Sequence, residues 1–532
     1  MTQAAETHDG ADSLRACARD SAPSPTSPDQ EGAVGAAGSE EPRSRRLLVG
    51  WLVACVAFFL IGAGWAIALP VDGTYDESEH LLRAYGAASG QLYTPPAAAA
   101  RGGGAYVEAP RSLLPDNVHC AWKGEQKQSA SCQHTPPNDT TRHRVGTTAG
   151  RYNPVYYVPV GIPMVLFPNQ TGIILGRLVS SLMSAMLLAS AVVVALRLRS
   201  KLLLAAVVLV TTPMAANLNG AINPNGLEIA AGVLLWATLI ALLRTPEKAL
   251  GERAVRRLLI LAAVTASLLL TVRALGPLWL AMIAVVALAV GRKDRLGALL
   301  KRRDTRWLLA GVSLVAVYAV AWFLVSGALT VVPNGGGGRE PLEDMLRTMV
   351  TTRASFWTNQ IVGQFSYGET VLPSWVIVSW YALVAALVLP AAVLARWRER
   401  WALIAVAAGS ALALAVLEVH YYPTLNWAQH SRYIMPFGVG LVLLAAVVGR
   451  YPEALGSDGQ RSLLRLAVVA TAPLHLFALV VVMTRFGLGP GAPANPFKGG
   501  WVPAAGPLVP LLALTAGLAL LIWYAWRDPT RQ

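Results

Sequence analysis

The sequence contains few charged residues for its length: Asp, Glu, Lys and Arg make up 14% of the 532 residues, while 54% are hydrophobic. Such a composition is not that of a soluble globular protein. The apolar residues do not form the short alternating segments of a membrane β-barrel, because they recur in long runs over most of the chain. The sequence therefore predicts an all-α polytopic membrane protein.

Several motifs of soluble enzymes and binding proteins are missing as well. The chain has no Walker loop, no Gly-x-Gly-x-x-Gly that opens a βαβ unit and no nucleophile elbow, which argues against ATP-driven and dinucleotide chemistry. The formal net charge is +14, but the basic residues lie in short loops between apolar runs, as the positive-inside rule predicts. Because no basic face with interleaved aromatics is present, we expect no nucleic-acid partner.

Cysteine is scarce, with four residues in the chain. Cys120 and Cys132 share one hydrophilic stretch, and their separation is not the Cys-x-x-Cys spacing of a metal pair. If the stretch lies outside the cytoplasm, a disulfide between them is permitted. A zinc site that also uses the flanking His119 and His134 is the alternative.

The apolar runs and the loops between them predict the organisation of the chain. Residues 1–42 are rich in Ala, Ser, Pro, Asp and Glu and should form a disordered cytoplasmic tail. Residues 43–450 should form the transmembrane core, with 70–152 as its longest hydrophilic loop, and residues 451–532 a C-terminal transmembrane helix pair. About twelve spans are expected, near 47–69, 170–196, 202–217, 226–243, 258–272, 276–290, 307–330, 373–394, 401–419, 432–449, 463–484 and 506–526.

The segment from Asn153 to Phe167 decides the sidedness of these spans. It is apolar but contains Pro154, Pro159 and Pro163 and is short for a span, so we interpret it as re-entrant or interfacial. With that choice, every cluster of Lys and Arg between spans falls on one side, as the positive-inside rule requires. We therefore expect a multi-pass plasma-membrane protein with both termini in the cytoplasm and the first large loop outside.

An acidic cluster directly follows the first apolar run and is the main candidate for catalysis. It contains Asp76, Glu77 and His80, beside a membrane surface where carboxylates are costly unless they bind a metal, a cation or a proton. Glu77 and His80 share a face if a helix begins near Tyr75. One carboxylate would take a proton from an acceptor hydroxyl, while the others orient it or hold a divalent ion such as Mg²⁺ or Mn²⁺. The alternative interpretation is the acidic start of an amphipathic helix.

Further candidates lie at the outer ends of other apolar runs. Glu228 begins one span and Arg273 ends another, and an ionisable group needs a partner there. Arg432 enters a span from an outer loop, where its planar guanidinium suits a phosphate. Snorkelling to lipid headgroups is the alternative interpretation of this arginine. The nearby aromatic residues form either an interfacial belt or the mouth of a lipid-linked substrate site.

Four groups of residues occur in an order that resembles a known family. They are Asp76-Glu77-x-x-His80-x-x-Arg83, Tyr152-x-Pro154-x-x-Tyr157, Ser355-Phe356-Trp357 with Leu372-Pro373-x-Trp375, and Ser431-Arg432-Tyr433-x-x-Pro436. Together they resemble the bacterial membrane proteins of domain of unknown function 2142, from about Leu47 to Arg450. Two positions depart from the family pattern: Ser431 stands where Gly is usual, and Asn225 stands where an acidic residue usually follows Asn-Pro.

This family is similar in layout to the GT-C glycosyltransferases, which carry an acidic pair in the first outer loop. The resemblance implies a GT-C-like bundle in the membrane, a polyprenyl-phosphate-linked sugar donor, a cell-envelope glycan or lipid acceptor, and an inverting transfer. It places Asp76 at the catalytic acidic position, with Glu77 and His80 beside it. The residues that we expect to bind substrates are Arg83, Tyr152, Tyr157, Asn223, Glu228, Arg273, Trp357, Arg432 and Tyr433.

A flippase or transporter for a lipid-linked saccharide is the alternative function. It would use the same charged residues as a permeation path and would need ionisable groups deep in several spans. In this sequence they collect at the outer ends of the spans, and the chain shows no internal repeat of the transporter kind. The sequence therefore favours the transferase.

Overall fold

The computed structural model describes residues 40–97, 104–122, 128–328, 341–425, 428–528 and 530. Residues 1–46 and 47–532 form two separate units, and only the helical residues 40–46 of the first unit are described. The tail predicted for residues 1–42 therefore lies almost entirely outside the described residues.

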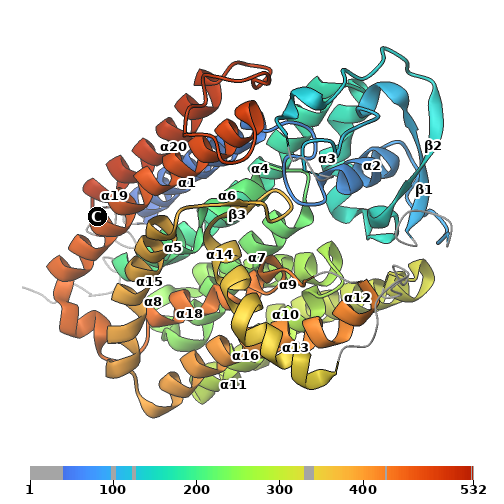
Figure 1. Ribbon diagram of the computed structural model, residues 1–532. Helices are drawn as coiled ribbons and strands as arrows, with labels where there is room; N and C mark the ends of the chain where they lie inside the picture. The colour runs from blue at the N-terminus through green and yellow to red at the C-terminus, as the bar shows by residue number, and fades with distance from the viewer. Residues whose placement is uncertain are drawn as a thin grey trace, which may run out of the picture. The chain divides into compact units, whose positions relative to one another are not determined.

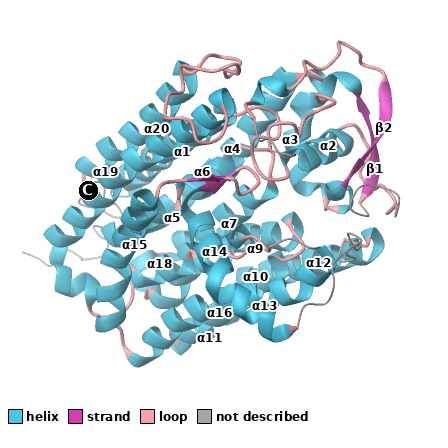
Figure 2. Ribbon diagram, in the orientation of Figure 1, coloured by secondary structure: helices cyan, strands magenta, loops and turns pink. Residues whose placement is uncertain are grey.

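Nine helices of the described chain are long and apolar enough to cross a membrane. They are α1 (Glu40–Ala68), α4 (Gln170–Arg197), α7 (Pro224–Arg244), α9 (Glu252–Val272), α12 (Arg303–Ser326), α15 (Ser374–Leu394), α16 (Trp397–Leu425), α19 (Tyr451–Leu488) and α20 (Leu508–Trp526). Each contains an apolar run near the roughly 20 residues that a bilayer core of about 30 Å requires. Helices dominate Figures 1 and 2 for this reason, and the prediction of an all-α polytopic membrane protein is confirmed.

Two of the three remaining expected spans are broken. α5 (Lys201–Val210) meets α6 (Pro213–Asn219) at 71° within the span expected over 202–217. α10 (Gly276–Val290) forms the span expected over 276–290 without a break, and it meets α11 (Lys293–Lys301) at 119° beyond that span. The first break falls at Pro213, which has no amide proton to continue the helix. The run expected as one span over 432–449 is instead divided into η6 (Ser431–Tyr433), α17 (Met435–Gly438) and α18 (Gly440–Ala445). Periodicity alone could not separate these from continuous spans.

The apolar segment after the first large loop forms one short helix, α3 (Pro154–Leu166). Asn153 caps it by accepting a hydrogen bond from the backbone amide of Val155, and Pro154 occupies the first turn. Its 13 residues rise about 20 Å, which is less than a bilayer core. α3 packs against α2 (Glu77–Ala88) and α4.

The first large loop contains a two-stranded sheet. The antiparallel strands β1 (Ala105–Pro110) and β2 (Arg142–Thr147) pair Ala105 with Thr147, and both contact α2. Figure 1 shows this strand pair beside α2 and α3. The remaining short elements are η2 (Arg111–Leu113), η3 (Ala130–Cys132), η4 (Thr148–Arg151), α8 (Glu247–Leu250), α13 (Leu342–Thr348), the π-helix η5 (Met349–Arg353), α14 (Ala354–Gly363), β3 (Gln364–Phe365) and β4 (Thr370–Val371).

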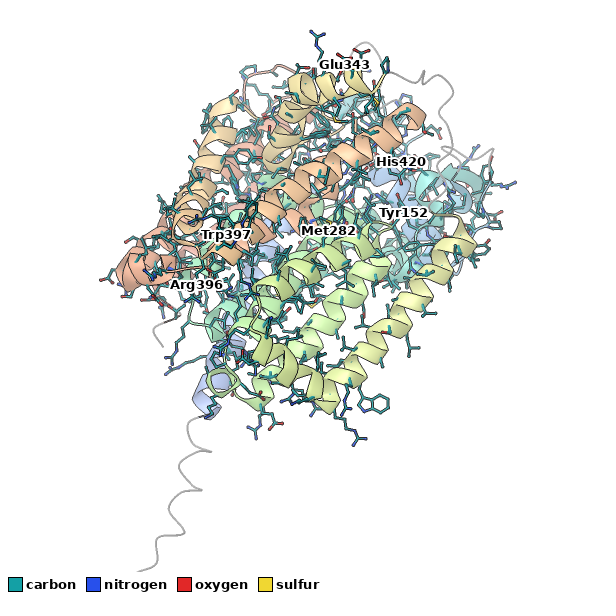
Figure 3. All side chains as sticks on the ribbon, turned by 90° about the horizontal axis from the view of Figure 1, so that it is seen from below. Tyr152, Met282, Glu343, Arg396, Trp397 and His420 are labelled. Carbon is teal, nitrogen blue, oxygen red and sulfur yellow. A yellow bond between two sulfur atoms is a disulfide. The ribbon has the colours of Figure 1, made fainter. Side chains whose placement is uncertain are left out.

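The loops between spans gather in two groups. At one end, Arg244 pairs with Glu399, and Glu399 also accepts a hydrogen bond from the amide of Gly449. At the other end, Arg432 pairs with Asp76. Figure 3 shows the same separation along α16, with Arg396 and Trp397 near its start and Tyr152 on the side of His420 near its end. We call the end with Arg244 and Glu399 the basic end. We call the end with Arg432 and Asp76 the outer end, after the sidedness that the sequence predicts.

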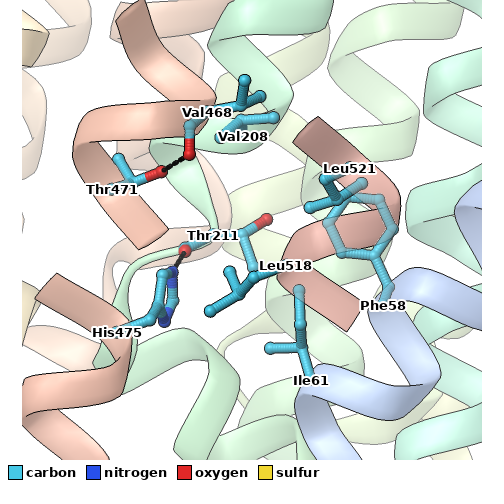
Figure 4. Close-up of a pocket in the computed structure, with 9 residues that line it drawn as sticks. All are labelled: Phe58, Ile61, Val208, Thr211, Val468, Thr471, His475, Leu518 and Leu521. Carbon is cyan, nitrogen blue, oxygen red and sulfur yellow. Dashed lines mark hydrogen bonds between the residues drawn. The ribbon is translucent and has the colours of Figure 1, made fainter. Parts of the chain in front are cut away.

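The C-terminal helix pair packs into the same core as the preceding spans. α19 contacts α5 and α20, and residues 47–532 form one compact unit. The Nε2 atom of His475 lies 3.0 Å from the carbonyl oxygen of Thr211, beside a gap of about 10 Å³ between α1, α5, α19 and α20 (Figure 4). That volume holds at most about one water molecule, so the gap is a packing defect and not a substrate site.

Candidate functional site

Asp76 is a partly exposed carboxylate of the outer end. It precedes the first residue of α2 with a left-handed backbone (φ 57°), which Asp tolerates better than most residues, and its side chain makes no capping hydrogen bond. The backbone amide donates to the hydroxyl of Tyr367 (3.1 Å). The carboxylate, 42% exposed, pairs with the Nη2 atom of Arg432 at 2.5 Å. The turn therefore directs this acid toward Arg432 and solvent instead of toward the helix that it begins.

Arg432 is fully buried, and only some of its hydrogen-bond donors have partners among the described residues. Its guanidinium lies over the ring of Tyr75 (4.2 Å to the centroid) and near the ring of Tyr433 (5.1 Å). The Nε and Nη1 atoms are buried and have no hydrogen-bond partner among the described residues. Buried charged donors without partners are costly, so the arrangement favours an anion at this position.

A second guanidinium also lies near the ring of Tyr433. Arg273 follows the last residue of α9, and its guanidinium is 5.1 Å from the Tyr433 ring and 5.6 Å from the Tyr152 ring. Its Nε atom is 3.8 Å from the carboxylate of Glu228 in the first turns of α7. The Oε1 atom of Glu228 is buried without a partner among the described residues. The structure thus brings together Asp76, Arg432, Arg273 and Glu228, which the sequence predicts as separate candidates.

Glu77 has a different environment from Asp76. Arg177 of α4 donates to both of its carboxylate oxygens, at 2.7 and 2.5 Å, and the amide of Ile222 donates to one of them at 3.2 Å. Arg177 also binds the carbonyl oxygens of Ala66, Leu69 and Pro70 at the end of α1. Glu77 therefore fastens the start of α2 to α1 and α4.

Arg177 is a residue that the sequence argument missed. It is the single charged residue between 171 and 196, inside an expected span. The rule that an ionisable residue in a membrane segment needs a partner would have identified it.

His80 lies deeper in α2. Its Nδ1 atom is 2.8 Å from the hydroxyl of Tyr157, and its ring stacks on those of Tyr152 and Tyr157. The described residues contain no group of three His, Cys, Asp or Glu side chains placed to hold a metal ion. Since Glu77 is occupied by Arg177 and His80 by Tyr157, these residues do not fit the divalent ion expected with Asp76.

Arg83 donates hydrogen bonds to backbone carbonyl oxygens, and its guanidinium lies 5.9 Å from the centroid of the Tyr157 ring. Its Nε and Nη2 atoms donate to the carbonyl oxygen of Tyr152 at 3.0 and 2.8 Å, and Nη1 and Nη2 donate to the carbonyl oxygens of Gln91 and Leu92. These contacts hold the backbone of Tyr152, whose ring lies near the ring of His80 and the guanidinium of Arg273. The substrate contact that the sequence predicts for Arg83 stays a prediction.

Asn223 and Trp357 also hold backbone near the site. Asn223 donates from its side chain to the carbonyl oxygen of Tyr75 (2.8 Å) and caps α7 by accepting from the amide of Asn225. Trp357 donates to the carbonyl oxygen of Gln429 (2.9 Å). Both residues are therefore near the site but bind the chain itself in this structure.

Two further residues join the outer loops and were not predicted as site residues. Asp72 accepts hydrogen bonds from His119 and Trp122, both at 2.9 Å, and from the hydroxyl of Tyr367 at 3.2 Å. Gln360 contacts the hydroxyl of Tyr75 and accepts from the amide of Ser431 at 2.7 Å. Asp72 lies four residues before Asp76 in the sequence, but no sequence signal marks Gln360.

The 119–122 segment is fixed by a disulfide and by an arginine from α19. Cys120 and Cys132 are joined, with 6.1 Å between their Cα atoms. Arg485 donates to the carbonyl oxygens of Ala121 (2.7 Å) and Gln128 (2.9 Å) and pairs with Glu369 at 3.0 Å. Both links hold the segment that supplies His119 and Trp122 to Asp72.

Cys120 and Cys132 are expected to resist thiol labelling in denatured protein from membranes prepared without reductant, and to label fully after reduction. A disulfide has no free thiol to react, and the pair lies in the loop that the charge rule places outside the cytoplasm. Mass spectrometry of alkylated peptides measures both states. Cys55, a free cysteine, should label in both and serves as the internal standard. Labelling of the pair before reduction would contradict the expectation.

The histidines of the site are expected to make the protein less stable in acid. Burial, with Arg273 and Arg432 nearby, holds the pKa of His80 well below its usual value of 6.5. The folded-state pKa is therefore lower than the unfolded one, so the contribution of neutral His80 to stability is present above pH 6.5 and is lost as the pH falls below it.

The His80→Gln variant should therefore show a smaller drop in unfolding temperature between pH 7.5 and pH 5 than the wild type. Some drop should remain, because burial and Arg432 also lower the pKa of His430. His134→Gln, which changes an exposed histidine, is the matched control and should leave the pH dependence unchanged. An unaltered drop in His80→Gln would show that His80 accepts a proton in the folded state.

Comparison with known proteins finds one matching family and one similar solved structure. The family described as "predicted membrane protein (DUF2142)" matches residues 59–444. The crystal structure of ArnT from Cupriavidus metallidurans bound to undecaprenyl phosphate is similar over 91% of this chain and 78% of that chain, with 13% identity and a TM-score of 0.40. No curated protein matches the chain.

Proposed function

We propose that this chain, which belongs to the DUF2142 family of predicted membrane proteins, is an integral-membrane glycosyltransferase. It moves a sugar from a polyprenyl-phosphate donor to a glycan or lipid acceptor of the cell envelope. Both termini lie in the cytoplasm, and the reaction takes place at the outer end of the bundle.

One observation carries this proposal. Asp76 presents a partly exposed carboxylate beside Arg432, a fully buried guanidinium with two unpartnered nitrogen atoms among the described residues. A base next to an anion-binding cation is what transfer from a phosphate leaving group to a hydroxyl requires. The site lies at the ends of α1, α7 and α9, which are long and apolar enough to cross a membrane, and this setting favours a donor whose phosphate is attached to a lipid.

The reaction is a single displacement in which every atom is accounted for. Asp76 accepts the proton of the acceptor hydroxyl as the hydroxyl oxygen attacks the anomeric carbon of the donor sugar. The new glycosidic bond forms while the bond from that carbon to the phosphate oxygen breaks. Polyprenyl phosphate leaves with the electron pair, and the configuration at the anomeric carbon is inverted.

The two guanidiniums act on the leaving group. The Nε and Nη1 atoms of Arg432 can donate to phosphate oxygens without first losing a protein partner. Arg273, which also lies near Tyr433, adds a second positive charge where negative charge develops. Tyr152 and Tyr157 form the wall beside His80 that closes this region on the side of α3.

The function is tested by incubating the purified protein with a panel of polyprenyl-phosphate sugars and envelope acceptors. Release of polyprenyl phosphate and transfer of labelled sugar are measured together, and both are expected for at least one donor. Proteoliposomes that contain the same donors test for movement of the intact lipid across the bilayer. Movement without any sugar release would overturn the transferase in favour of the flippase.

A further inference from the structure

A groove lies between two spans at the basic end, far from Asp76. It has a volume of about 600 Å³ and lies between the first turns of α9 and α12. Its lining includes Arg253, Arg256, Arg302 and Arg303, together with the apolar side chains of Ile260 and Trp307. We call it the α9–α12 groove. Because α9 runs 21 residues from this groove to Arg273, roughly 30 Å separates it from the candidate site.

The groove carries a net positive charge. Its four arginines face two acids, Glu252 and Asp304, which leaves a formal charge of +2. Arg302 is occupied by Glu247 at 3.0 Å and Asp304 at 2.9 Å. Arg256 and Arg303 are exposed and have no acidic partner in the part of the chain that the structure describes. They are therefore available to an anion from outside the chain.

The two helix ends add to this preference for an anion. α9 begins at Glu252 after Gly251, and α12 begins at Arg303 after Arg302. Neither preceding residue gives its helix a side-chain cap. The positive ends of two helix dipoles thus meet at the groove.

The other wall of the groove faces lipid. Ile260 is 42% exposed and Trp307 is 67% exposed. Only 6% of the apolar window of α12 is buried inside the protein. A tryptophan next to arginines at the end of such a span marks the bilayer interface.

We propose that the α9–α12 groove binds an anionic phospholipid of the leaflet at the basic end. The phosphodiester lies between Arg256 and Arg303, and the acyl chains lie along Ile260 and the surface of α12. Charge complementarity and the lipid-facing wall together select this occupant, because basic pockets between spans bind anionic headgroups and a soluble anion would make no use of the apolar wall.

The test is native mass spectrometry of the full chain released from vesicles of equal parts phosphatidylglycerol and phosphatidylcholine. The wild type is expected to retain phosphatidylglycerol at least about fivefold over phosphatidylcholine. The Arg256→Gln/Arg303→Gln double variant should lose that preference, with roughly tenfold weaker retention. Equal retention of the two lipids by the wild type would overturn the proposal whether or not the variant folds.

The control is Arg257→Gln/Arg306→Gln, which removes the same charge from the same two helices at residues outside the groove lining. It should keep the preference of the wild type. Equal loss in both double variants would mean that general surface charge, not the groove, attracts the lipid. Displacement of phosphatidylglycerol by millimolar inorganic phosphate would identify a free-anion site and would also overturn the proposal.

Discussion

Asp76→Asn is expected to abolish sugar transfer while the protein still folds and inserts. The amide cannot accept the proton of the acceptor hydroxyl, and loss of a general base costs roughly 100- to 10,000-fold in rate. Folding should survive because Asn tolerates the left-handed backbone at position 76 and keeps an oxygen for Arg432. The measurement is labelled-sugar transfer at saturating donor, with the unfolding temperature as the check on folding.

The control for this substitution is Asp116→Asn. Asp116 is another exposed carboxylate of the first large loop, so its replacement makes the same chemical change outside the Asp76–Arg432 pair. It should leave the transfer rate within about twofold of the wild type. Wild-type turnover in Asp76→Asn would remove the catalytic assignment but would leave the family membership intact.

Arg432→Lys is expected to keep the charge and lose most of the activity. A lysine cannot reproduce the planar set of donors, of which Nη2 binds Asp76 while Nε and Nη1 have no partner among the described residues. It also loses the stacking on Tyr75. The loss should be about 1 to 3 kcal/mol, or roughly five- to 150-fold, and should appear mainly as weaker use of the donor.

Arg450→Lys is the matched substitution at the other end of the bundle. Arg450 is exposed, and its backbone amide faces the carbonyl oxygen of Leu394 at the basic end. A basic residue at that position only sets topology, so lysine should serve equally well. Equal activity in the two variants would mean that Arg432 is an interfacial anchor and that the phosphate clamp is wrong.

The spans could be predicted from the sequence because each depends on one continuous stretch of apolar residues. An apolar run of sufficient length has few alternatives to a membrane helix, so each expected span has a helical counterpart among the described residues. The breaks within expected spans were harder to predict from the sequence. The 432–449 run becomes short helices even though its composition is that of a span. Such a break depends on the packing of neighbouring helices, which the periodicity of the sequence does not reveal.

The candidate site could be predicted in its residue types but not in its pairings. Asp76 and Arg432 were singled out separately, and nothing local relates two residues that are 356 positions apart. For the same reason the sequence treated Asp76, Glu77 and His80 as one cluster, whereas Glu77 pairs with Arg177 from another span. Adjacent positions on a helix point in different directions, and the partner of each is chosen by the fold.

Arg485 lies outside the part of the chain that matches the family, yet it supports the structure around the candidate site. The family match ends at residue 444, yet this arginine of α19 holds Ala121, Gln128 and Glu369 in place around the outer end. A truncated chain that stops where sequence similarity stops would keep Asp76 and Arg432 but would release the loop behind them. Expression of the shared segment alone is therefore a poor substitute for the whole chain, since a portion that lies outside the family match supports the architecture of the site.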